Sequence, residues 1–393
     1  SKQQLVRRHV GQQLAAYYAQ PANLVVGKST LVDDSNLSSL MGEWHWKRVF
    51  QRMYDEREGH WLTPVELFRP HYSNILADFC VHATKGVESS DLEIVELGGG
   101  RGTNAMQILD YVADTHPEVY SKLTYTLVDS SPSLHQLQKN TLRESDHADR
   151  VRFELKDLMD VAEKKTMLLP RSDTPTVVLG MEVLDNLPHD KVRAKSRKKL
   201  EQAEVRISRS GDQEEIFVPL GDPLLKKVIK KVPAYTRPTL SPTWVPSVAC
   251  GVMLHLLKQR KNLGMAFADF DWLPPPDLYI EEEQGSPKSV WSNGEPIVTD
   301  MDGKDYQCYL TSPENCDILF PTDFPKLAHF VKQSMTDEKE VKVFKQSDFL
   351  QTFGPSHAKA TKSWLTGHSP LLDDFSNCSV LTVTSNPSAG TES

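Results

Sequence analysis

A glycine-rich turn constrains the fold of this chain more than any other stretch of its sequence. The turn lies within IVELGGGRGTNAMQIL, residues 94–109, where an apolar run typical of a buried strand ends in an acid. After the turn, apolar residues recur at i, i+3, i+4 and i+7, as on the buried stripe of an amphipathic helix: Ala105, Ile108, Leu109 and Val112. A strand, a glycine turn and a helix form the first half of a βαβ unit, with free backbone N–H groups where the helix begins.

The spacing of the glycines narrows the choice of ligand. A dinucleotide fingerprint requires G-x-G-x-x-G, and its third glycine would fall on Thr103. A phosphate-binding P-loop requires a lysine that the turn lacks. The pattern acid-x-Gly-x-Gly-x-Gly is complete in Glu96, Gly98, Gly100 and Gly102, and it resembles motif I of S-adenosyl-L-methionine-dependent methyltransferases. We therefore predict that these residues bind S-adenosyl-L-methionine, with a plain tight turn as the alternative, because a lone glycine motif is weak evidence.

The composition excludes several classes of protein. Of the 393 residues, 39% are apolar and 25% are charged, which is ordinary for a globular protein. No apolar run reaches the length of about 18 residues that a membrane-spanning helix needs, so we expect no membrane span. The net charge of −8 argues against a surface that binds nucleic acid as a whole. The five cysteines are scattered, without a C-x-x-C pair, which suggests a reducing compartment and no structural zinc.

Short apolar runs predict the strands of an α/β fold. Five runs come in order: 92–97, 123–128, 151–155, 176–179 and 265–268. Plausible helices separate the first four of them. This pattern is typical of a doubly wound, mostly parallel sheet. Two later runs, 341–344 and 380–384, suit an antiparallel edge. The predicted fold is a Rossmann-like class I methyltransferase, with added N-terminal helices and an inserted β-hairpin.

The same features divide the chain into parts. We expect an N-terminal helical segment on the substrate side (1–90) and a disordered tail (386–393). The methyltransferase core between them has two parts (91–190 and 246–385), which an insertion separates (191–245). The insertion contains a predicted hairpin around the Ser-Gly-Asp of residues 210–212. We expect the proline-rich stretch 271–289 to be a loop. The basic N-terminus is either the remnant of a transit peptide or the first helix.

Acids stand at the ends of the five apolar runs, where ligands bind in open α/β sheets. Asp129 ends the second run, and we predict that it accepts hydrogen bonds from the ribose hydroxyls of an adenosine ligand. Capping of the next helix is then left to Ser130 or Ser131. Asp157 follows the third run and either contacts the adenine or caps its own helix.

The order of motifs along the chain resembles the MidA-like family of Rossmann-fold methyltransferases, which includes the mitochondrial complex I assembly methyltransferase. The matching motifs are LTPVELF, ELGGGRGT, LVDSSPSLHQLQ, GMEVLDNLP, FADFDW and CDILFPTDF. The family's E-L-G-x-G-R-G-T is reproduced in residues 96–103. Its N-E-x-x-D-A-L-P is matched in residues 182–188, except that Met181 replaces the Asn and Asn186 replaces the Ala. Its T-S-P-E is displaced into residues 63–66.

The resemblance implies a methyltransferase that acts on an arginine of a protein partner in the mitochondrial matrix, with the cytoplasm as the alternative location. Glu182 and Asp185, three residues apart past the fourth strand, are the predicted catalytic residues. Carboxylates pair with a planar guanidinium through two hydrogen bonds and so orient it. The alternative for Asp185 is a bracing role in the turn before Pro188.

Two other functions remain open from the sequence. The first is a catalytically inactive methyltransferase-like scaffold within a mitochondrial assembly such as the ribosome, which the changed substrate motifs favour. The second is a nicotinamide oxidoreductase, which Thr103 in the glycine motif disfavours.

A basic run, KVRAKSRKK, follows the predicted catalytic acids at residues 191–199. We expect a solvated loop, with a contact arm for RNA phosphates or an acidic protein face as the alternative. The arm would use six basic side chains: Lys191, Arg193, Lys195, Arg197, Lys198 and Lys199. Because no aromatic residue is interleaved with them, any affinity for nucleic acid would be independent of base sequence and would depend steeply on salt.

Overall fold

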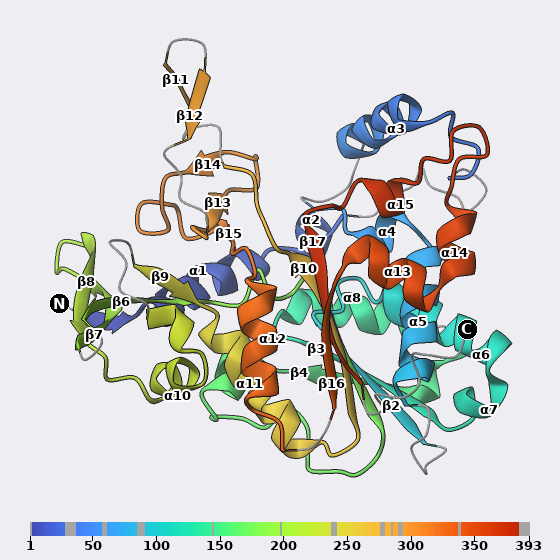
Figure 1. The fold of residues 1–393 in the computed structure, drawn as a ribbon, viewed down its shortest axis with the longest axis horizontal. Helices are drawn as coiled ribbons and strands as arrows, with labels where there is room; N and C mark the ends of the chain where they lie inside the picture. The colour runs from blue at the N-terminus through green and yellow to red at the C-terminus, as the bar shows by residue number, and fades with distance from the viewer. Residues whose placement is uncertain are drawn as a thin grey trace.

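The computed structural model (Figure 1) describes residues 2–27, 37–56, 61–84, 91–143, 145–196, 199–236, 242–275, 280–283, 286–289, 294–336 and 339–384. A seven-stranded sheet forms its centre, in the order β16-β17-β10-β5-β2-β3-β4. The strands are β2 (Leu92–Leu97), β3 (Leu123–Asp129), β4 (Val151–Leu155), β5 (Thr176–Met181), β10 (Leu263–Phe270), β16 (Glu340–Lys345) and β17 (Cys378–Thr384). The run from β4 to β10 is parallel, and β17 is antiparallel to both of its neighbours. The predicted doubly wound fold with an antiparallel edge is therefore confirmed.

Helices cover both faces of this sheet, which explains why its parallel strands are apolar along their whole length. Neighbouring residues of β2 point to opposite faces: Ile94 packs into one hydrophobic cluster and Val95 into the other. One face is covered by α5 (His71–Ala83), α6 (Thr103–Thr115), α7 (Pro117–Tyr120), α8 (Pro132–Arg143), α13 (Gln346–Phe353), α14 (Pro355–Ala360) and α15 (Pro370–Asp373). The other face is covered by α9 (Leu158–Ala162), α10 (Pro223–Lys231), α11 (Ser247–Gln259) and α12 (Phe324–Lys332).

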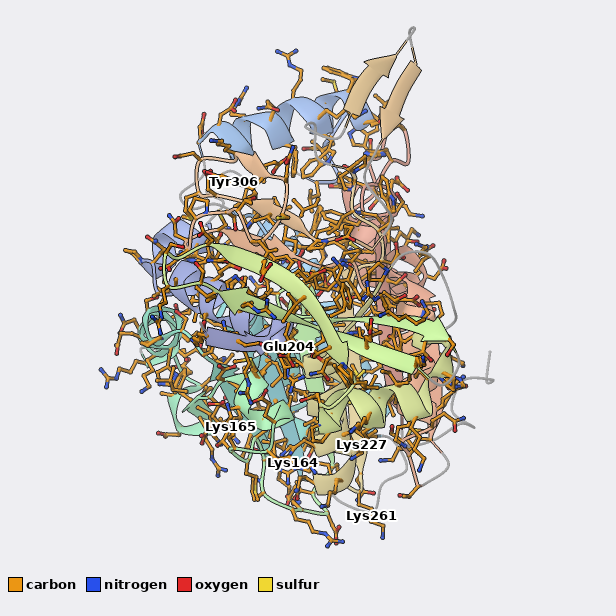
Figure 2. The ribbon with its side chains drawn as sticks, turned by 90° about the vertical axis from the view of Figure 1, so that its left-hand side faces the viewer. Lys164, Lys165, Glu204, Lys227, Lys261 and Tyr306 are labelled. Carbon is orange, nitrogen blue, oxygen red and sulfur yellow. The ribbon has the colours of Figure 1, made fainter. Side chains whose placement is uncertain are left out.

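The inserted segment forms a second sheet. The expectation of a loop over residues 191–199 is therefore wrong for the described part of that run, residues 191–196 and 199. Its strands are β6 (Asp190–Ser196), β7 (Lys199–Ile207), β8 (Gln213–Pro219) and β9 (Thr243–Val245), joined by β1 (Lys2–Leu5) from the N-terminus. The hairpin predicted around residues 210–212 is β7–β8. Figure 2 looks onto this sheet, where Glu204 marks β7. Strand β7 is paired along both edges, with β8 on one side and with β6 and β1 on the other.

Three of the basic side chains, on β6, have acidic partners inside this sheet. Glu201 on β7 lies 2.7 Å from an Nη of Arg193 and 2.8 Å from Nζ of Lys195. Lys191 Nζ lies 3.4 Å from Glu215 on β8. Arg197 and Lys198 lie outside the described residues. Contact of the run with RNA or an acidic protein stays a prediction.

The stretch expected to be a loop over residues 271–289 contains two paired strands, so that expectation is also wrong in part. Strands β11 (Ile280–Glu283) and β12 (Ser286–Ser289) form an antiparallel hairpin that projects from the body in Figure 1. Pairing satisfies the backbone N–H and C=O groups that a loop would leave to water. A three-stranded sheet follows, made of β13 (Ile297–Thr299), β14 (Asp305–Tyr306) and β15 (Asp317–Leu319).

The N-terminal segment supplies α1 (Val6–Tyr18), α2 (Ala22–Val25), α3 (Glu43–Asp55) and α4 (Pro64–Leu67). Helix α1 buries an apolar side against β7 and against the sheet formed by β13–β15. None of the helices in the described parts of the chain is long and apolar enough to cross a membrane.

One buried arginine joins α1 to the rest of the molecule. The side chain of Arg7 is 2% exposed, and its three nitrogens each lie close to a carboxylate. The distances are 2.7 Å to Asp190 on β6, 2.8 Å to Asp222 at the start of α10, and 3.0 Å to Glu163 just after α9. The three acids are themselves at most 8% exposed, so the arginine balances charge that water cannot reach.

We expect Arg7→Met to lower the free energy of unfolding by about 3–5 kcal/mol, because it leaves buried carboxylates without their cation. Urea denaturation followed by circular dichroism measures the change. The matched control is Arg8→Met, since Arg8 is half exposed and pairs with the same Glu163 at 3.2 Å. An exposed pair contributes only about 0–1 kcal/mol. Equal losses in the two variants would contradict the structural role of Arg7.

Candidate functional site

A cavity of about 830 Å³ lies at the carboxyl ends of β2, β3, β5 and β10. Side chains of α1, α4 and the β13–β15 sheet form its outer wall. This is the edge at which open α/β sheets bind ligands. Every predicted cofactor-binding and catalytic residue except Gly102 lines the cavity: Glu96, Gly98, Gly100, Asp129, Asp157, Glu182 and Asp185.

The glycine turn has a backbone that other residues rarely adopt. Gly98, Gly100 and Gly102 have φ angles of 67°, 51° and 84°, in the left-handed region that favours glycine. The N–H of Gly98 donates to the C=O of Val128, which ties the turn to the end of β3. Gly102 directly precedes α6. The turn thus brings bare backbone and the first N–H groups of α6 to the cavity.

Glu96 is buried at the end of β2, and protein donors hold both of its oxygens. Asn104 donates its side-chain N–H to Oε1 at 2.7 Å, and the Tyr125 hydroxyl donates to Oε2 at 2.8 Å. Burial raises the pKa of Glu96. The carboxylate therefore braces the first turn of α6 against β3, and its direct contact with a cofactor stays a prediction.

Asp129 ends β3 with its carboxylate held in a fixed orientation. Oδ1 accepts from the Ser131 N–H at 2.9 Å, and Oδ2 accepts from the Gln138 amide at 2.9 Å. The same amide donates to the C=O of Gly100, so Asp129 and the glycine turn are positioned together. Burial raises the pKa of Asp129 to about 6. The backbone of Ser130 adds a third hydrogen bond, so about one of the four lone-pair sites of the carboxylate remains for a ribose hydroxyl.

Asp157 occupies the N-cap of α9, where its side chain accepts from the Met159 N–H at 2.8 Å. The structure thus shows the capping role, one of the two alternatives for this residue. Asp157 also lines the cavity, and its contact with adenine stays a prediction.

Glu182 follows β5 in a strained conformation. Its φ is 53°, in the left-handed region, although it carries a side chain. Such strain costs of order 1–3 kcal/mol and persists where the surroundings hold it, often at functional sites. The Glu182 N–H donates to the C=O of Ala268 at the end of β10. Within the described residues, no hydrogen-bond donor reaches its carboxylate.

Asp185 lines the cavity on this side, and the buried Asp269 holds its backbone. Asp185 is 3% exposed, and its Oδ1 has no hydrogen-bond partner among the described residues. Its backbone N–H donates to Asp269 Oδ2, and its C=O accepts from the Phe320 N–H, so the backbone braces the turn while the side chain faces the cavity. Asp269, at the end of β10, also accepts from the N–H groups of Leu184 and Phe270.

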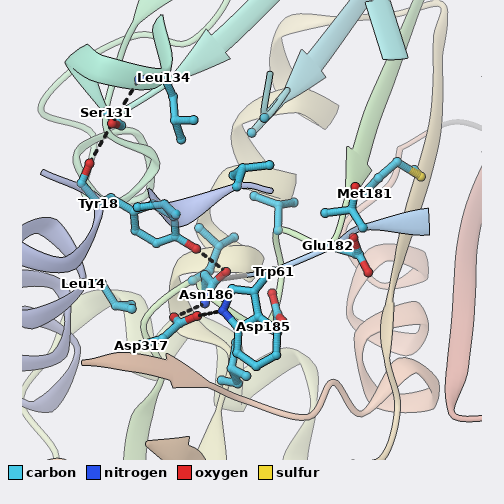
Figure 3. Close-up of a pocket in the computed structure, with 18 of the residues that line it drawn as sticks. Leu14, Tyr18, Trp61, Ser131, Leu134, Met181, Glu182, Asp185, Asn186 and Asp317 are labelled. Carbon is cyan, nitrogen blue, oxygen red and sulfur yellow. Dashed lines mark hydrogen bonds between the residues drawn. The ribbon is translucent and has the colours of Figure 1, made fainter. Parts of the chain in front are cut away.

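A chain of hydrogen bonds crosses the cavity and ends at Asp317 on β15 (Figure 3). The Ser131 hydroxyl donates to the C=O of Tyr18, and the Tyr18 hydroxyl donates to Asn186 Oδ1 at 2.6 Å. The Asn186 amide donates to Asp317 Oδ1 at 2.9 Å, and the Trp61 indole donates to Oδ2 at 2.8 Å. The chain joins the cofactor side of the cavity to its acidic side.

The sequence analysis did not select Asp269 or Asp317 as site residues. The sequence signal for both was present, since Asp269 ends an apolar run and Asp317 opens a motif shared with the resembled family. What the sequence did not reveal is that the two acids lie beside Asp185. The structure shows it: Asp269 accepts a hydrogen bond from the backbone N–H of Asp185, and the next residue, Asn186, donates to Asp317.

The acids share one desolvated region. Burial is the largest cause of the raised pKa of Glu182, Asp185, Asp269 and Asp317, and repulsion between the carboxylates adds to it for Glu182 and Asp185. The pKa values of Asp269 and Asp317 rise to about 7. In the described part of the chain, no lysine or arginine forms an ion pair with these four acids, and no cluster has the ligands of a metal site. These acids are therefore poorly solvated and have no neutralising cation in the described part of the chain.

Comparison with known proteins places this geometry in a family. A family described as "Putative S-adenosyl-L-methionine-dependent methyltransferase" matches residues 75–341. Two crystal structures from Burkholderia thailandensis share the fold. The first, bound to S-adenosyl-homocysteine, is 16% identical in sequence and has a TM-score of 0.61. The alignment covers 97% of the present chain and 87% of the Burkholderia chain. The second, a native structure, is 17% identical and has a TM-score of 0.55, and the alignment covers 96% of the present chain and 93% of the other. A search of curated proteins found no match.

The residues of the cavity fit the cofactor that this family uses. The left-handed glycines leave space for a ligand against the backbone, since a Cβ on Gly100 would meet nothing closer than Val26 at 3.8 Å. Asp129 presents oriented acceptors one strand away. The cofactor of this chain is S-adenosyl-L-methionine.

We expect Gly100→Val to abolish binding of S-adenosyl-homocysteine, because the side chain would strain the φ of 51° and enter the space at the turn. Asp129→Ala should weaken binding by about 1.5–3 kcal/mol, the contribution of a hydrogen bond to a charged group. Isothermal titration calorimetry measures both. The control is Gly211→Val in the β7–β8 turn, which has a φ of 95° and no neighbour within 4 Å. Wild-type affinity in folded Gly100→Val would contradict the assignment.

The raised pKa values predict how stability depends on pH. Asp269 and Asp317 hold protons in the folded chain up to about pH 7, whereas they lose them near 4 when unfolded. Their contribution to the free energy of unfolding is therefore complete below about pH 4 and is lost as pH rises through 7, by up to about 1.4 kcal/mol per pH unit for each. Urea denaturation between pH 4.5 and 8 should show a shallower fall for Asp317→Asn, which lacks one of these two acids. Identical slopes in the two chains would contradict the raised pKa values.

Proposed function

The chain belongs to the family of S-adenosyl-L-methionine-dependent methyltransferases, and from this premise we propose that it methylates an arginine of a protein partner. The observation that carries the proposal is the group of carboxylates beside the cofactor edge, with no cation of their own in the described chain. The motif resemblance to the MidA-like family supports the same substrate. A role in mitochondria follows from that resemblance alone and remains a proposal.

A guanidinium suits these carboxylates better than other cations do. It stays charged at any physiological pH and offers five N–H donors in a planar fork. Asp185 Oδ1 is a buried acceptor without a partner, and the Glu182 carboxylate has no donor within the described residues. A lysine is the weaker candidate, because carboxylates stabilise its ammonium form, and an ammonium nitrogen has no lone pair with which to attack.

The residues of the site can then be given roles in the transfer. Bound S-adenosyl-L-methionine supplies a methyl group on a positively charged sulfur. Glu182 and Asp185 orient the guanidinium so that one nitrogen faces that methyl, and positioning of this kind is the main catalytic demand of an in-line displacement. The new N–C bond forms as the C–S bond breaks, and the nitrogen loses one proton. The Glu182 carboxylate accepts it, since a pKa raised by burial makes a carboxylate a better base.

We expect Glu182→Gln to reduce methyl transfer by about 100-fold or more, because it keeps the shape of the side chain and removes the charge. The assay incubates the chain with tritiated S-adenosyl-L-methionine and an extract from cells grown with a methylation inhibitor. Acid hydrolysis of the labelled protein then separates methyl-arginine from methyl-lysine. Binding of S-adenosyl-homocysteine should be unchanged.

The control for this assay is Glu214→Gln, an exposed carboxylate on β8 that pairs with Arg206. It should transfer methyl groups at the wild-type rate. Label in methyl-lysine or in small molecules, with none in methyl-arginine, would contradict the proposed substrate.

A further inference from the structure

Helix α10 carries only lysines as charged residues on the side that it turns away from the core. Its sequence, PLLKKVIKK, buries an apolar side and places four lysines on the other: Lys226, Lys227, Lys230 and Lys231. These lysines form two pairs of like charge at i, i+4, an arrangement that destabilises a helix. The helix dipole favours cations in the last turn, where Lys230 and Lys231 lie. Lys226 and Lys227 therefore add charge that the helix itself does not favour.

Two lysines from other helices extend this charged side. Helices α9 and α10 both pack against α11. Lys258 lies in the last turn of α11, and Lys164 follows the C-cap of α9. Partial burial lowers the pKa of Lys227, and the charges of Lys164 and Lys258 lower it further, so the three ammonium groups are close. In Figure 2, Lys164 and Lys227 lie near each other below the second sheet.

We call this surface the lysine face. It consists of six residues: Lys164, Lys226, Lys227, Lys230, Lys231 and Lys258. Lys164 holds a position at which helices usually end in glycine, since its φ is 61°, in the left-handed region. The chain thus keeps a cation at a strained position beside α10.

No acid neutralises the lysine face within the described residues. None of its six lysines forms an ion pair there, whereas the neighbouring Lys165 pairs with Glu163 at 2.9 Å. The acids closest in sequence are already bound, because Arg7 holds both Glu163 and Asp222, the N-cap of α10. Unbalanced positive charge therefore gathers on one face of a chain whose net charge is −8.

We propose that the lysine face binds the sugar-phosphate backbone of nucleic acid without reading its bases. Lysine contacts phosphate as a point charge, and a nucleic-acid strand supplies the closely spaced negative charges that this face lacks. The face has no aromatic side chain on which a base could stack. A lipid surface is a weaker candidate, because the face has no apolar side chain to enter the bilayer. An acidic protein is also weaker, because lysine is depleted in protein interfaces.

The lysine face lies away from the cavity. None of its residues lines the cavity, and Lys258 comes just before the start of β10, whereas the cavity lies at the other end of that strand. Bound nucleic acid would therefore leave the cavity open, and the inference does not depend on methyl transfer. The basic run over residues 191–199 is a weaker candidate for this contact, because Arg193 and Lys195 already pair with Glu201.

The test measures binding of fluorescein-labelled single strands of about 20 nucleotides to the full chain by fluorescence anisotropy. RNA and DNA of one sequence should both bind, and so should a second, unrelated sequence. The logarithm of the association constant should fall with the logarithm of the salt concentration, with a slope of about −4, because each of six phosphate contacts contributes about −0.7. No binding at about 50 mM salt, or a slope shallower than about −1, would overturn the proposal.

Lys227→Gln combined with Lys230→Gln should make that slope shallower by about 1.4 and weaken binding at about 100 mM salt by about 10- to 30-fold. Glutamine is a good helix former, so α10 should be kept. The matched control is Lys359→Gln combined with Lys362→Gln, two exposed lysines in and just after α14, on the opposite face of the central sheet. The control should bind like the wild-type chain. Equal weakening in the two double variants would overturn the proposal.

Two further probes test the other classes of partner. They are vesicles of phosphatidylcholine with phosphatidylserine, and poly-glutamate. Lysine-dependent binding to either probe that is tighter than binding to the oligonucleotides at the same salt concentration would overturn the choice of nucleic acid. Affinity for S-adenosyl-homocysteine should be unchanged in both double variants, which separates this result from the proposed methyl transfer.

Discussion

The cost of removing carboxylates from water organises the functional half of this molecule. The chain pays that cost in two different ways. Around Arg7, the acids Asp190, Asp222 and Glu163 receive a cation from the chain itself, and the result is a fixed joint between α1 and the inserted sheet. At the carboxyl ends of β5 and β10, neighbouring acids share a region without such a cation and respond with raised pKa values. A cation of the chain neutralises the first group of acids, whereas protons held at raised pKa values neutralise acids of the second.

Much of the fold could be predicted because its signals are local. A strand buried on both faces must be apolar along its length, and a left-handed turn must contain glycine, so β2 and the turn from Gly98 to Gly102 are visible in the sequence. The antiparallel edge formed by β16 and β17 was visible for the same reason. Strand pairings between residues far apart in the sequence could not be predicted. Strand β1 joins β7 from the N-terminal segment, and most of the basic run pairs as β6 with β7, where Glu201 lies opposite Arg193.

The candidate site likewise has one side that could be predicted from the sequence and one side that could not. The spacing of Gly98, Gly100 and Asp129 identified the cofactor side, because each sits at a strand end that the pattern reveals. The acidic side required the sheet order, which sets β10 beside β5 and brings Asp269 against the backbone of Asp185.

The departures from the resembled family's motifs take on a physical meaning in this structure. Asn186 stands where that family has alanine, which reads as drift when the sequence is taken alone. In the folded chain its amide joins Tyr18 to Asp317, a contact that alanine could not make. A change next to the predicted catalytic acids is thus accommodated by partners from α1 and β15.

The contacts of α1 with residues far along the chain have a consequence for how the protein folds during its synthesis. Arg7 meets Asp190 and Asp222 across 183 and 215 residues of sequence, and Gln13 donates to the C=O of Tyr309 across 296. Helix α1 is synthesised before these partners, and Tyr309 follows Gln13 after about 15–60 s at ordinary rates of translation. Until then the apolar side of α1 lacks the part of its native cover that β13–β15 supply. The cavity wall that α1 and these strands form together therefore assembles only after residue 319 has been made.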